Sequence, residues 1–223
     1  GLFHLVADEM RLLGRRMEWL QPAVMAPMEP SSYMARDGLK IHGYLTVPRG
    51  AERKNLPLVV VPHGGPAARD VWGFDTFVQL LASRGYAVLQ PNFRGSTGYG
   101  REFYELGRRE AGGKIQNDIA DATRWAIASG IADPARIAIV GVSFGGYSAL
   151  FALGHDPELY RCGISFAGVT DWMGIFEEGS RRPELALARA HWVDQIGDPA
   201  GDEARLRAVS PINFADKITA PVL

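Results

Sequence analysis

The chain has 223 residues and a formal net charge of −1 at pH 7, with 47% hydrophobic and 22% charged residues. This length allows one large domain with a substantial buried core. The near-neutral charge lacks the basic surface of proteins that bind nucleic acid or anionic membranes, so we expect neither partner. No apolar run approaches the roughly 20 residues that cross a bilayer. Asp8, Glu9 and Arg11 come too early for a signal peptide.

Cys162 is the single cysteine of the sequence, which leaves no internal disulfide and no thiol-based metal cluster. This cysteine usage suits a reducing compartment, and we expect a cytoplasmic location. No group of histidines, cysteines and carboxylates has metal-ligand spacing. The glycine patterns at 95–100 and 112–113 lack the context of a dinucleotide site. We therefore expect no metal and no cofactor.

The first 50 residues predict strands only. FHLV (3–6) and MRLLGR (10–15) resemble a strand pair, and the proline- and methionine-rich stretch QPAVMAPMEP (21–30) predicts a joint after them. Residues 32–47 predict an antiparallel hairpin that turns at Arg36-Asp37-Gly38. This hairpin is expected to flank the main sheet.

From residue 56 onward, short apolar runs alternate with helical patterns. The predicted strands cover 56–61, 86–93, 136–142 and 162–169, and the predicted helices cover 73–84, 115–129, 145–154 and 184–196. Such alternation is typical of a parallel sheet covered by helices on both faces. A further apolar strand begins at Pro221-Val222-Leu223. We predict an α/β fold with a mostly parallel central sheet, and we interpret the chain as a fragment that lacks the last strands of that sheet.

Gly141-Val142-Ser143-Phe144-Gly145 matches the G-x-S-x-G pattern of a nucleophile elbow, with a predicted strand before it and a predicted helix after it. In such an elbow the serine lies on a sharp turn that exposes its hydroxyl at the carboxyl edge of the sheet. The glycines remove Cβ atoms where strand and helix approach closely. We predict Ser143 as the catalytic nucleophile and the Phe144 N–H as an oxyanion donor.

The segment His63-Gly64-Gly65-Pro66 follows the predicted strand at 56–61, where this kind of fold places its second oxyanion donor. We assign His63 and Gly64 to the wall of the oxyanion hole. A simple tight turn is the alternative. His63 precedes the nucleophile in the chain, which favours a place in this wall over a role as general base.

Together these motifs resemble the prolyl oligopeptidase family of serine peptidases, and within it the acylaminoacyl-peptidase-like branch. The resemblance is carried by RDGLKIHGYLTVP (36–48), HGGP (63–66), RGYAVLQPNFRGSTGYG (84–100), GVSFGGYSAL (141–150), DPELYRCGISFAGVTDW (156–172) and SPINFADKITAPVL (210–223). Members of that family join a β-propeller to an α/β-hydrolase domain. The resemblance implies that residues 1–20 are the tail of a propeller blade with its linker, and that residues 21–223 are an α/β-hydrolase catalytic domain, incomplete at its C-terminus. The propeller itself would be missing.

The resemblance also implies a catalytic triad in the chain order Ser, Asp, His. Its Asp and His are expected on loops beyond Leu223, so this chain alone should be close to inactive. His155 lies at the far end of the helix after Ser143, roughly 15 Å or more away at 1.5 Å per residue. We expect Asp171 to structure its loop rather than to act as the triad acid.

By the same resemblance, Val169 and Trp172 line the pocket for the residue before the scissile bond, and Phe144 and Ile175 complete an apolar slot. Ordinary core packing is the alternative for all four. Arg94 is a candidate for binding a substrate carbonyl or carboxylate. It is also a candidate for anchoring its own loop through an internal carboxylate, the role we favour.

The leading hypothesis is the truncated catalytic domain of a serine peptidase that hydrolyses short peptides, with N-acylated peptides among the candidates, through an ester on Ser143. A carboxylesterase on the same fold is the second hypothesis, because a fold alone does not fix the substrate. The third is a non-catalytic binding or assembly fragment. An unpaired sheet edge and exposed apolar surface would favour self-association.

Overall fold

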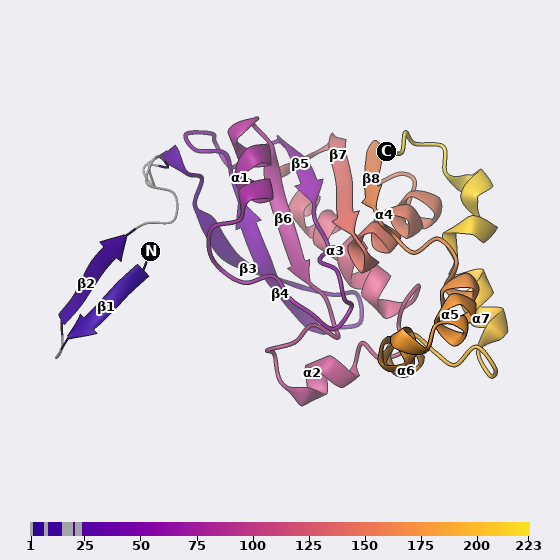
Figure 1. The fold of residues 1–223 in the computed structure, drawn as a ribbon. Helices are drawn as coiled ribbons and strands as arrows, with labels where there is room; N and C mark the ends of the chain where they lie inside the picture. Colours follow the sequence, from indigo (N-terminus) through magenta and orange to yellow (C-terminus); the bar gives the residue numbers. More distant parts are fainter. Residues whose placement is uncertain (1, 7–8, 15–19, 21–23) are drawn as a thin grey trace.

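The structure is a computed structural model, and it describes residues 2–6, 9–14, 20 and 24–223. Near the N-terminus, β1 (Leu2–Val6) and β2 (Glu9–Gly14) pair antiparallel as a separate two-stranded sheet, which Figure 1 shows standing apart from the main body. This confirms the predicted strand pair. Arg15, the last residue of the second predicted strand, and residues 21–23 of the predicted joint lie outside the described residues. The end of that joint is not a linker, because residues 28–30 begin the strand Met28–Met34.

The main sheet has six strands in the order β3-β4-β6-β5-β7-β8. Their bounds are β3 Met28–Met34, β4 Lys40–Thr46, β5 Leu56–Val60, β6 Ala87–Asn92, β7 Ala132–Val142 and β8 Cys162–Phe166. The pairs β3-β4 and β4-β6 are antiparallel, whereas β6-β5, β5-β7 and β7-β8 are parallel. The predicted hairpin therefore flanks a parallel sheet, as the sequence pattern indicated.

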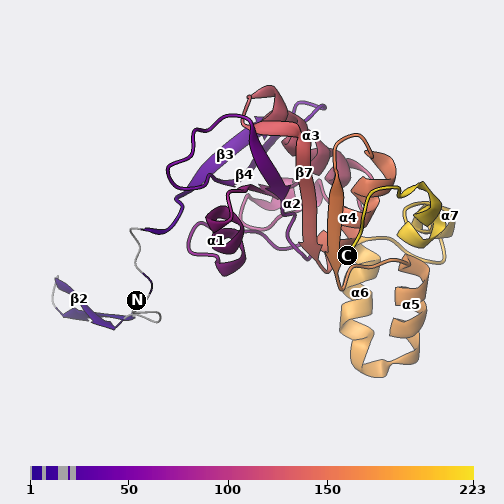
Figure 2. The ribbon, with the colours of Figure 1, turned by 90° about the horizontal axis from the view of Figure 1, so that it is seen from above.

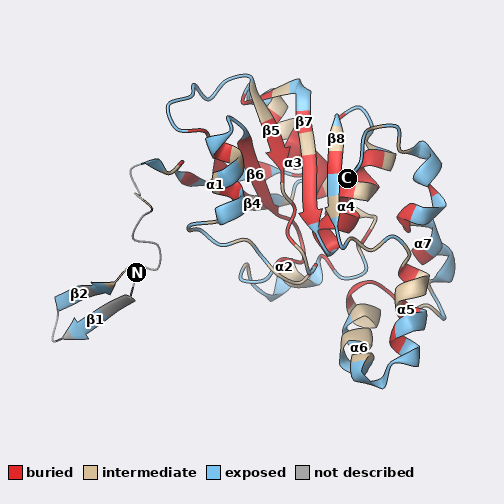
Figure 3. Ribbon diagram, turned by 45° about the horizontal axis from the view of Figure 1, so that its top comes forward, coloured by how far each residue is buried: buried red, intermediate tan, exposed pale blue. Residues whose placement is uncertain are grey.

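Helices cover both faces of this sheet. In Figure 2, α1 (Thr76–Ser83) lies on one side, and α3 (Lys114–Ala128) and α4 (Phe144–His155) lie on the other. Burial on both faces explains why every residue of β6 is buried and why its sequence shows no polar alternation. Figure 3 shows the buried residues concentrated in the central strands. The short α2 (Arg101–Glu105) was not predicted, because five residues are too few for a helical period to show.

The segment after β8 is mostly helical. It contains α5 (Trp172–Arg181), α6 (Ala186–Gln195), α7 (Glu203–Ala208) and three single turns at 183–185, 211–213 and 215–217. Figure 2 shows α5 and α6 side by side, projecting from the body. Of these helices, α6 was predicted and α5 and α7 were not. No helix among the described residues has the length and apolar character needed to cross a bilayer.

The last three residues extend the sheet beside β8. The Gly163 N–H donates to the Pro221 carbonyl at 3.0 Å, and the Leu223 N–H donates back to the Gly163 carbonyl at 3.1 Å. Val222 thereby forms a parallel bridge with Gly163. This confirms that a strand begins at Pro221, and it places residues 221–223 beyond β8 in the sheet.

Candidate active site

Ser143 lies between the end of β7 and the start of α4, with φ 56° and ψ −120°. A positive φ is rare for a residue with a side chain and stores about 1–3 kcal/mol of strain. The Ser143 N–H donates to the Phe166 carbonyl of β8 at 2.9 Å, which holds the turn against the sheet. The Ser143 side chain does not cap α4, and the residue is exposed. The turn therefore presents a free hydroxyl to solvent.

The glycines of the elbow are required by close packing. A Cβ atom on Gly141 would lie 2.1 Å from the carbonyl carbon of Gly145, and a Cβ atom on Gly145 would lie 2.2 Å from the Pro62 oxygen. Both distances are far inside van der Waals contact. The first contact sets the tight strand-to-helix turn, and the second brings α4 against the loop that leaves β5.

Two sets of backbone N–H groups flank Ser143. The first turn of α4, which begins at Phe144, has N–H groups with no partner inside the helix. The loop after β5 lies close by, because a Cβ atom on Gly64 would be 3.6 Å from Cβ of Ser143. The N–H groups of Gly64 and Gly65 make no hydrogen bond to any described residue. We call residues 63–66 the oxyanion loop.

The His63 ring is buried within this loop rather than turned toward Ser143. Its Nδ1 lies 2.7 Å from the Gly64 carbonyl oxygen, and its Nε2 lies 2.8 Å from Oγ of Ser96. The ring stacks on Phe93 with centroids 4.2 Å apart. Burial lowers the pKa of His63 to about 4, so the ring is neutral near pH 7.

The other histidines also lie away from the nucleophile. His155 ends α4, where its Nδ1 contacts the Phe151 carbonyl at 3.2 Å and its ring stacks on Phe151. The remaining three are on β4, α6 and β1: His42, His191 and His4. Within the described part of the chain, no hydrogen bond joins an imidazole to the Ser143 hydroxyl.

The four predicted pocket residues differ in how far their side chains are buried. Trp172 and Phe144 are fully buried, and Trp172 packs 6.4 Å from Phe144 and 5.1 Å from Tyr147 between ring centroids. Val169 and Ile175 are half-buried. Phe144 and Trp172 therefore pack in the core, as the alternative interpretation of these residues expected. A pocket role for the four residues remains a prediction.

Asp171 begins α5 by accepting from the Met173 N–H at 3.0 Å, which confirms its loop-structuring role.

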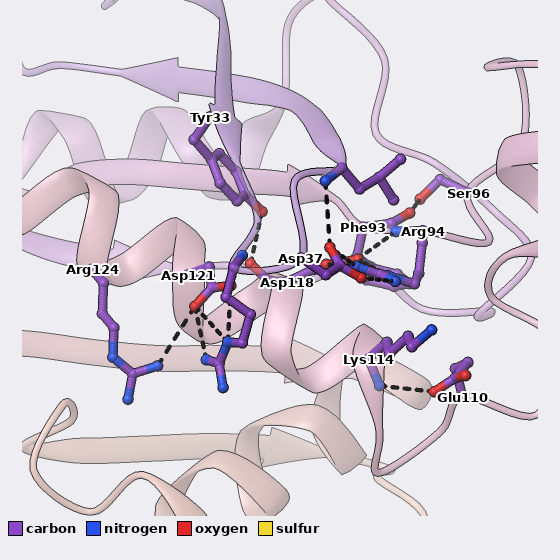
Figure 4. A network of polar contacts seen from close by, with 12 residues as sticks. Tyr33, Asp37, Phe93, Arg94, Ser96, Glu110, Lys114, Asp118, Asp121 and Arg124 are labelled. Carbon is purple, nitrogen blue, oxygen red and sulfur yellow. Dashed lines mark hydrogen bonds and ion pairs between the residues drawn. The ribbon is translucent and has the colours of Figure 1, made fainter.

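Arg94 is buried in a cluster of carboxylates, shown in Figure 4. Its guanidinium donates to Asp118 at 2.7 and 2.8 Å and to Asp37 at 2.8 and 3.0 Å, and its backbone N–H also donates to Asp118. The Arg94 hydrogen bonds lower the pKa of Asp37 to about 2. Arg94 thus anchors its own loop through internal carboxylates, which is the role that we favoured from the sequence. Substrate binding by Arg94 remains a prediction.

Two features of this region were missed from the sequence. Ser96 was part of the quoted NFRGSTGYG stretch but received no role, although it contacts His63. Gly65 was not assigned to the wall of the oxyanion hole beside His63 and Gly64, although its N–H is as free as that of Gly64. A Gly-Gly pair after a buried strand is a signal for both donors, whereas the Ser96 contact joins residues 33 positions apart and leaves no local pattern.

The comparisons with known proteins agree with this geometry. The chain belongs to the prolyl oligopeptidase family, whose model matches residues 72–223. It is 36% identical to dipeptidyl aminopeptidase BIII of Pseudoxanthomonas mexicana, over 92% of this chain and 31% of that protein. It is 31% identical to the acylamino-acid-releasing enzyme of Sus scrofa, over 90% of this chain and 28% of that enzyme.

Solved structures give the same assignment. A puromycin-hydrolyzing peptidase of Mycobacterium tuberculosis matches with a TM-score of 0.87 and 29% identity, over 97% of this chain and 34% of that one. The chain thus spans about a third of the length of the relatives it matches. These findings confirm the α/β-hydrolase fold and the resemblance to serine peptidases of the prolyl oligopeptidase type.

Proposed function

We propose that this chain is the nucleophile-bearing part of a peptidase that hydrolyses short peptides through an acyl-enzyme on Ser143. The observation that carries the proposal is the exposed Ser143 hydroxyl, held on a strained turn between two groups of free backbone N–H donors. Such a turn is characteristic of a serine nucleophile in α/β-hydrolases.

The proposed reaction is acyl transfer in two steps. Oγ of Ser143 attacks the carbonyl carbon of the scissile peptide bond while its proton passes to a base. The Phe144 N–H and the oxyanion loop donate to the resulting oxyanion, and each such donor contributes roughly 10²–10³ to kcat. Collapse of the intermediate expels the amine, which takes up the proton. Water then attacks the ester, releases the acid and restores the Ser143 hydroxyl.

We further propose that the general base and its carboxylate partner come from residues outside these 223. The support is the placement of the histidines: His63 is committed to Ser96 and Gly64, and His155 is committed to Phe151. Loss of triad members typically costs about 10⁴–10⁶ in turnover. The 223-residue chain by itself should therefore turn over substrate very slowly.

The substrate class is proposed from the relatives. Their names describe release of acylamino acids and of dipeptides from peptides. We therefore propose short peptides as the substrate of the full-length protein, with N-acylated peptides and dipeptidyl units as the two candidate groups at the amino end.

A chromogenic panel tests these proposals on the full-length protein. Acetyl-aminoacyl, dipeptidyl and free aminoacyl p-nitroanilides are compared with the p-nitrophenyl ester of the same acyl group. We expect turnover of at least one peptide amide and its loss in Ser143→Ala. Full activity in Ser143→Ala would refute the nucleophile, and ester turnover without any amide turnover would replace the peptidase by an esterase.

A further inference from the structure

Ser96 joins the loop after β6 to the oxyanion loop after β5. Its Oγ lies 2.8 Å from Nε2 of His63, and both residues are buried, with 0% of Ser96 and 8% of His63 exposed. This contact has no part in the reaction as proposed above. The inference drawn from it deepens that proposed function and rests on it.

The Ser96 side of the contact is rigid. The Ser96 N–H donates to the Phe93 carbonyl at 3.1 Å, and Oγ of Ser96 lies 2.6 Å from the same carbonyl oxygen. The neighbouring Gly95 N–H donates to the Phe103 carbonyl, and Arg94 is held by the buried carboxylate of Asp118. Figure 4 shows Ser96 beside this ion-paired cluster. The hydroxyl therefore has a fixed position in the protein.

The His63 side of the contact acts on the backbone of the oxyanion loop. Its Nδ1 lies 2.7 Å from the Gly64 carbonyl oxygen. That carbonyl belongs to the same planar peptide unit as the Gly65 N–H, and in a trans peptide the two groups point in opposite directions. A hydrogen bond from His63 to the carbonyl therefore fixes the direction of the Gly65 N–H.

The Ser96 and His63 contacts depend on each other, because the serine hydroxyl and the neutral ring have few hydrogens to share among them. Three contacts lie in a row, from the Phe93 carbonyl to Ser96, from Ser96 to His63, and from His63 to the Gly64 carbonyl. Both carbonyls can only accept. A neutral ring has one N–H and the serine has one O–H, so two hydrogens serve three contacts. When the Ser96 hydroxyl donates to Nε2 of His63, the ring hydrogen lies on Nδ1 and is donated to Gly64. The contact with Ser96 also holds the ring in the position that this hydrogen bond requires.

We propose that Ser96 is a positioning residue for the oxyanion hole: acting through His63, it sets the orientation of the Gly64–Gly65 peptide. The transition state gains more from this orientation than the bound substrate does, because the oxyanion exists only after attack. Loss of the Ser96 hydroxyl should therefore lower kcat and leave KM nearly unchanged.

The first test compares Ser96→Ala and Ser96→Thr in the full-length protein. Since the change acts on one oxyanion donor indirectly, Ser96→Ala should lower kcat about 10-fold and keep KM within about twofold. Affinity for a peptide boronate, which mimics the tetrahedral intermediate, should fall by the same factor. Ser96→Thr retains the hydroxyl and should restore both values. Unchanged kcat in Ser96→Ala, or a rise in KM alone, would overturn the proposal.

A double-mutant cycle separates positioning from folding. In His63→Asn the carboxamide N–H₂ stands near the position of Nδ1 and does not depend on Ser96 for its hydrogen. Adding Ser96→Ala to His63→Asn should therefore change kcat less than twofold, whereas multiplicative losses would overturn the coupling.

Two controls complete the design. Thr123→Val removes another buried hydroxyl, which contacts Tyr160 at 2.8 Å, and should lower the melting temperature without lowering kcat. An equal loss of kcat in Thr123→Val would assign the Ser96 effect to general stability and overturn the proposal. Turnover that survives Ser143→Ala would refute the proposed function itself, whereas full kcat in Ser96→Ala overturns only the role of Ser96.

Discussion

Arg94 and Asp118 form an ion pair with both side chains out of solvent, 2% and 0% exposed, and with Nη2 and Oδ1 2.7 Å apart. The pair joins the loop after β6 to α3, on the side of the sheet away from α1. Because neither charge is hydrated, each depends on the other for stabilisation. The loop that carries Ser96 is therefore anchored electrostatically.

Removal of one partner should be costly. Asp118→Asn leaves the Arg94 cation buried with only the half-exposed Asp37 to compensate it. We expect a loss of about 3–5 kcal/mol in the free energy of unfolding, measured by urea titration. The control Glu203→Gln breaks the exposed pair with Arg207 and should change stability by less than about 1 kcal/mol. Equal small effects in both variants would contradict the anchoring role.

His63 should make stability depend on pH. Its pKa is lowered by burial from 6.5 to about 4, so the unfolded chain takes up a proton in this range while the folded one does not. The contribution of the neutral, buried His63 ring to the free energy of unfolding is therefore fully present above pH 6.5 and is lost as the pH falls toward 4. This contribution is about 3 kcal/mol.

The measurement is the free energy of unfolding of the wild type and of His63→Asn at pH 7.5 and pH 4.5. The wild type should lose clearly more stability on acidification than the variant. Identical pH dependence in the two proteins would mean that the ring is not buried in its neutral form.

Gly145 should tolerate no side chain. The Cβ atom of Gly145→Ala would lie 2.2 Å from the Pro62 oxygen, so α4 and the oxyanion loop must separate. We expect a loss of about 1–3 kcal/mol in stability and slower reaction of Ser143 with an active-site probe. Gly201→Ala, where nothing lies within 4 Å of the new atom, serves as the matched control. Unaltered probe reactivity in Gly145→Ala would contradict the packing account of the elbow.

The 223-residue chain, prepared alone, should self-associate at the sheet edge where residues 221–223 lie beside β8. Phe166 and Ile164 on this strand are 70% and 37% exposed, and Leu223 beside it is 83% exposed. Exposed apolar groups beside an outer edge of a sheet favour association with a second copy. Sedimentation velocity should show oligomers that Phe166→Glu reduces. Leu187→Glu, on the exposed surface of α6, should leave them unchanged, and a monomeric chain would contradict the prediction.

Much of the fold was predictable because it depends on local patterns. The strand at 56–61 is a continuous apolar run, and the strand at 86–93 is mostly apolar with Gln90 and Asn92 near its end. The structure places β5 and β6 there with both faces covered. The helix α5 was missed because Gly174 and Gly179 weaken its helical pattern, although Asp171 before Trp172 is an N-cap signal.

The parts of the candidate active site that are short sequence motifs were predictable from the sequence. The elbow at Ser143 and the glycine loop at 63–66 each lie within a few residues, so their spacing is visible in the sequence. The contact between Ser96 and His63 and the burial of Arg94 against Asp118 depend on strand order and packing. Neither follows from any local spacing.

The most direct test of the central claim is reaction of Ser143 with a fluorophosphonate probe, with Ser143→Ala as control, on the 223-residue chain and on the full-length protein. We predict rapid labelling of the full-length protein, its loss in Ser143→Ala, and little labelling of the 223-residue chain. Equally rapid labelling of the short chain at Ser143 would contradict a base outside these residues. Full-length labelling that survives Ser143→Ala would contradict the nucleophile itself.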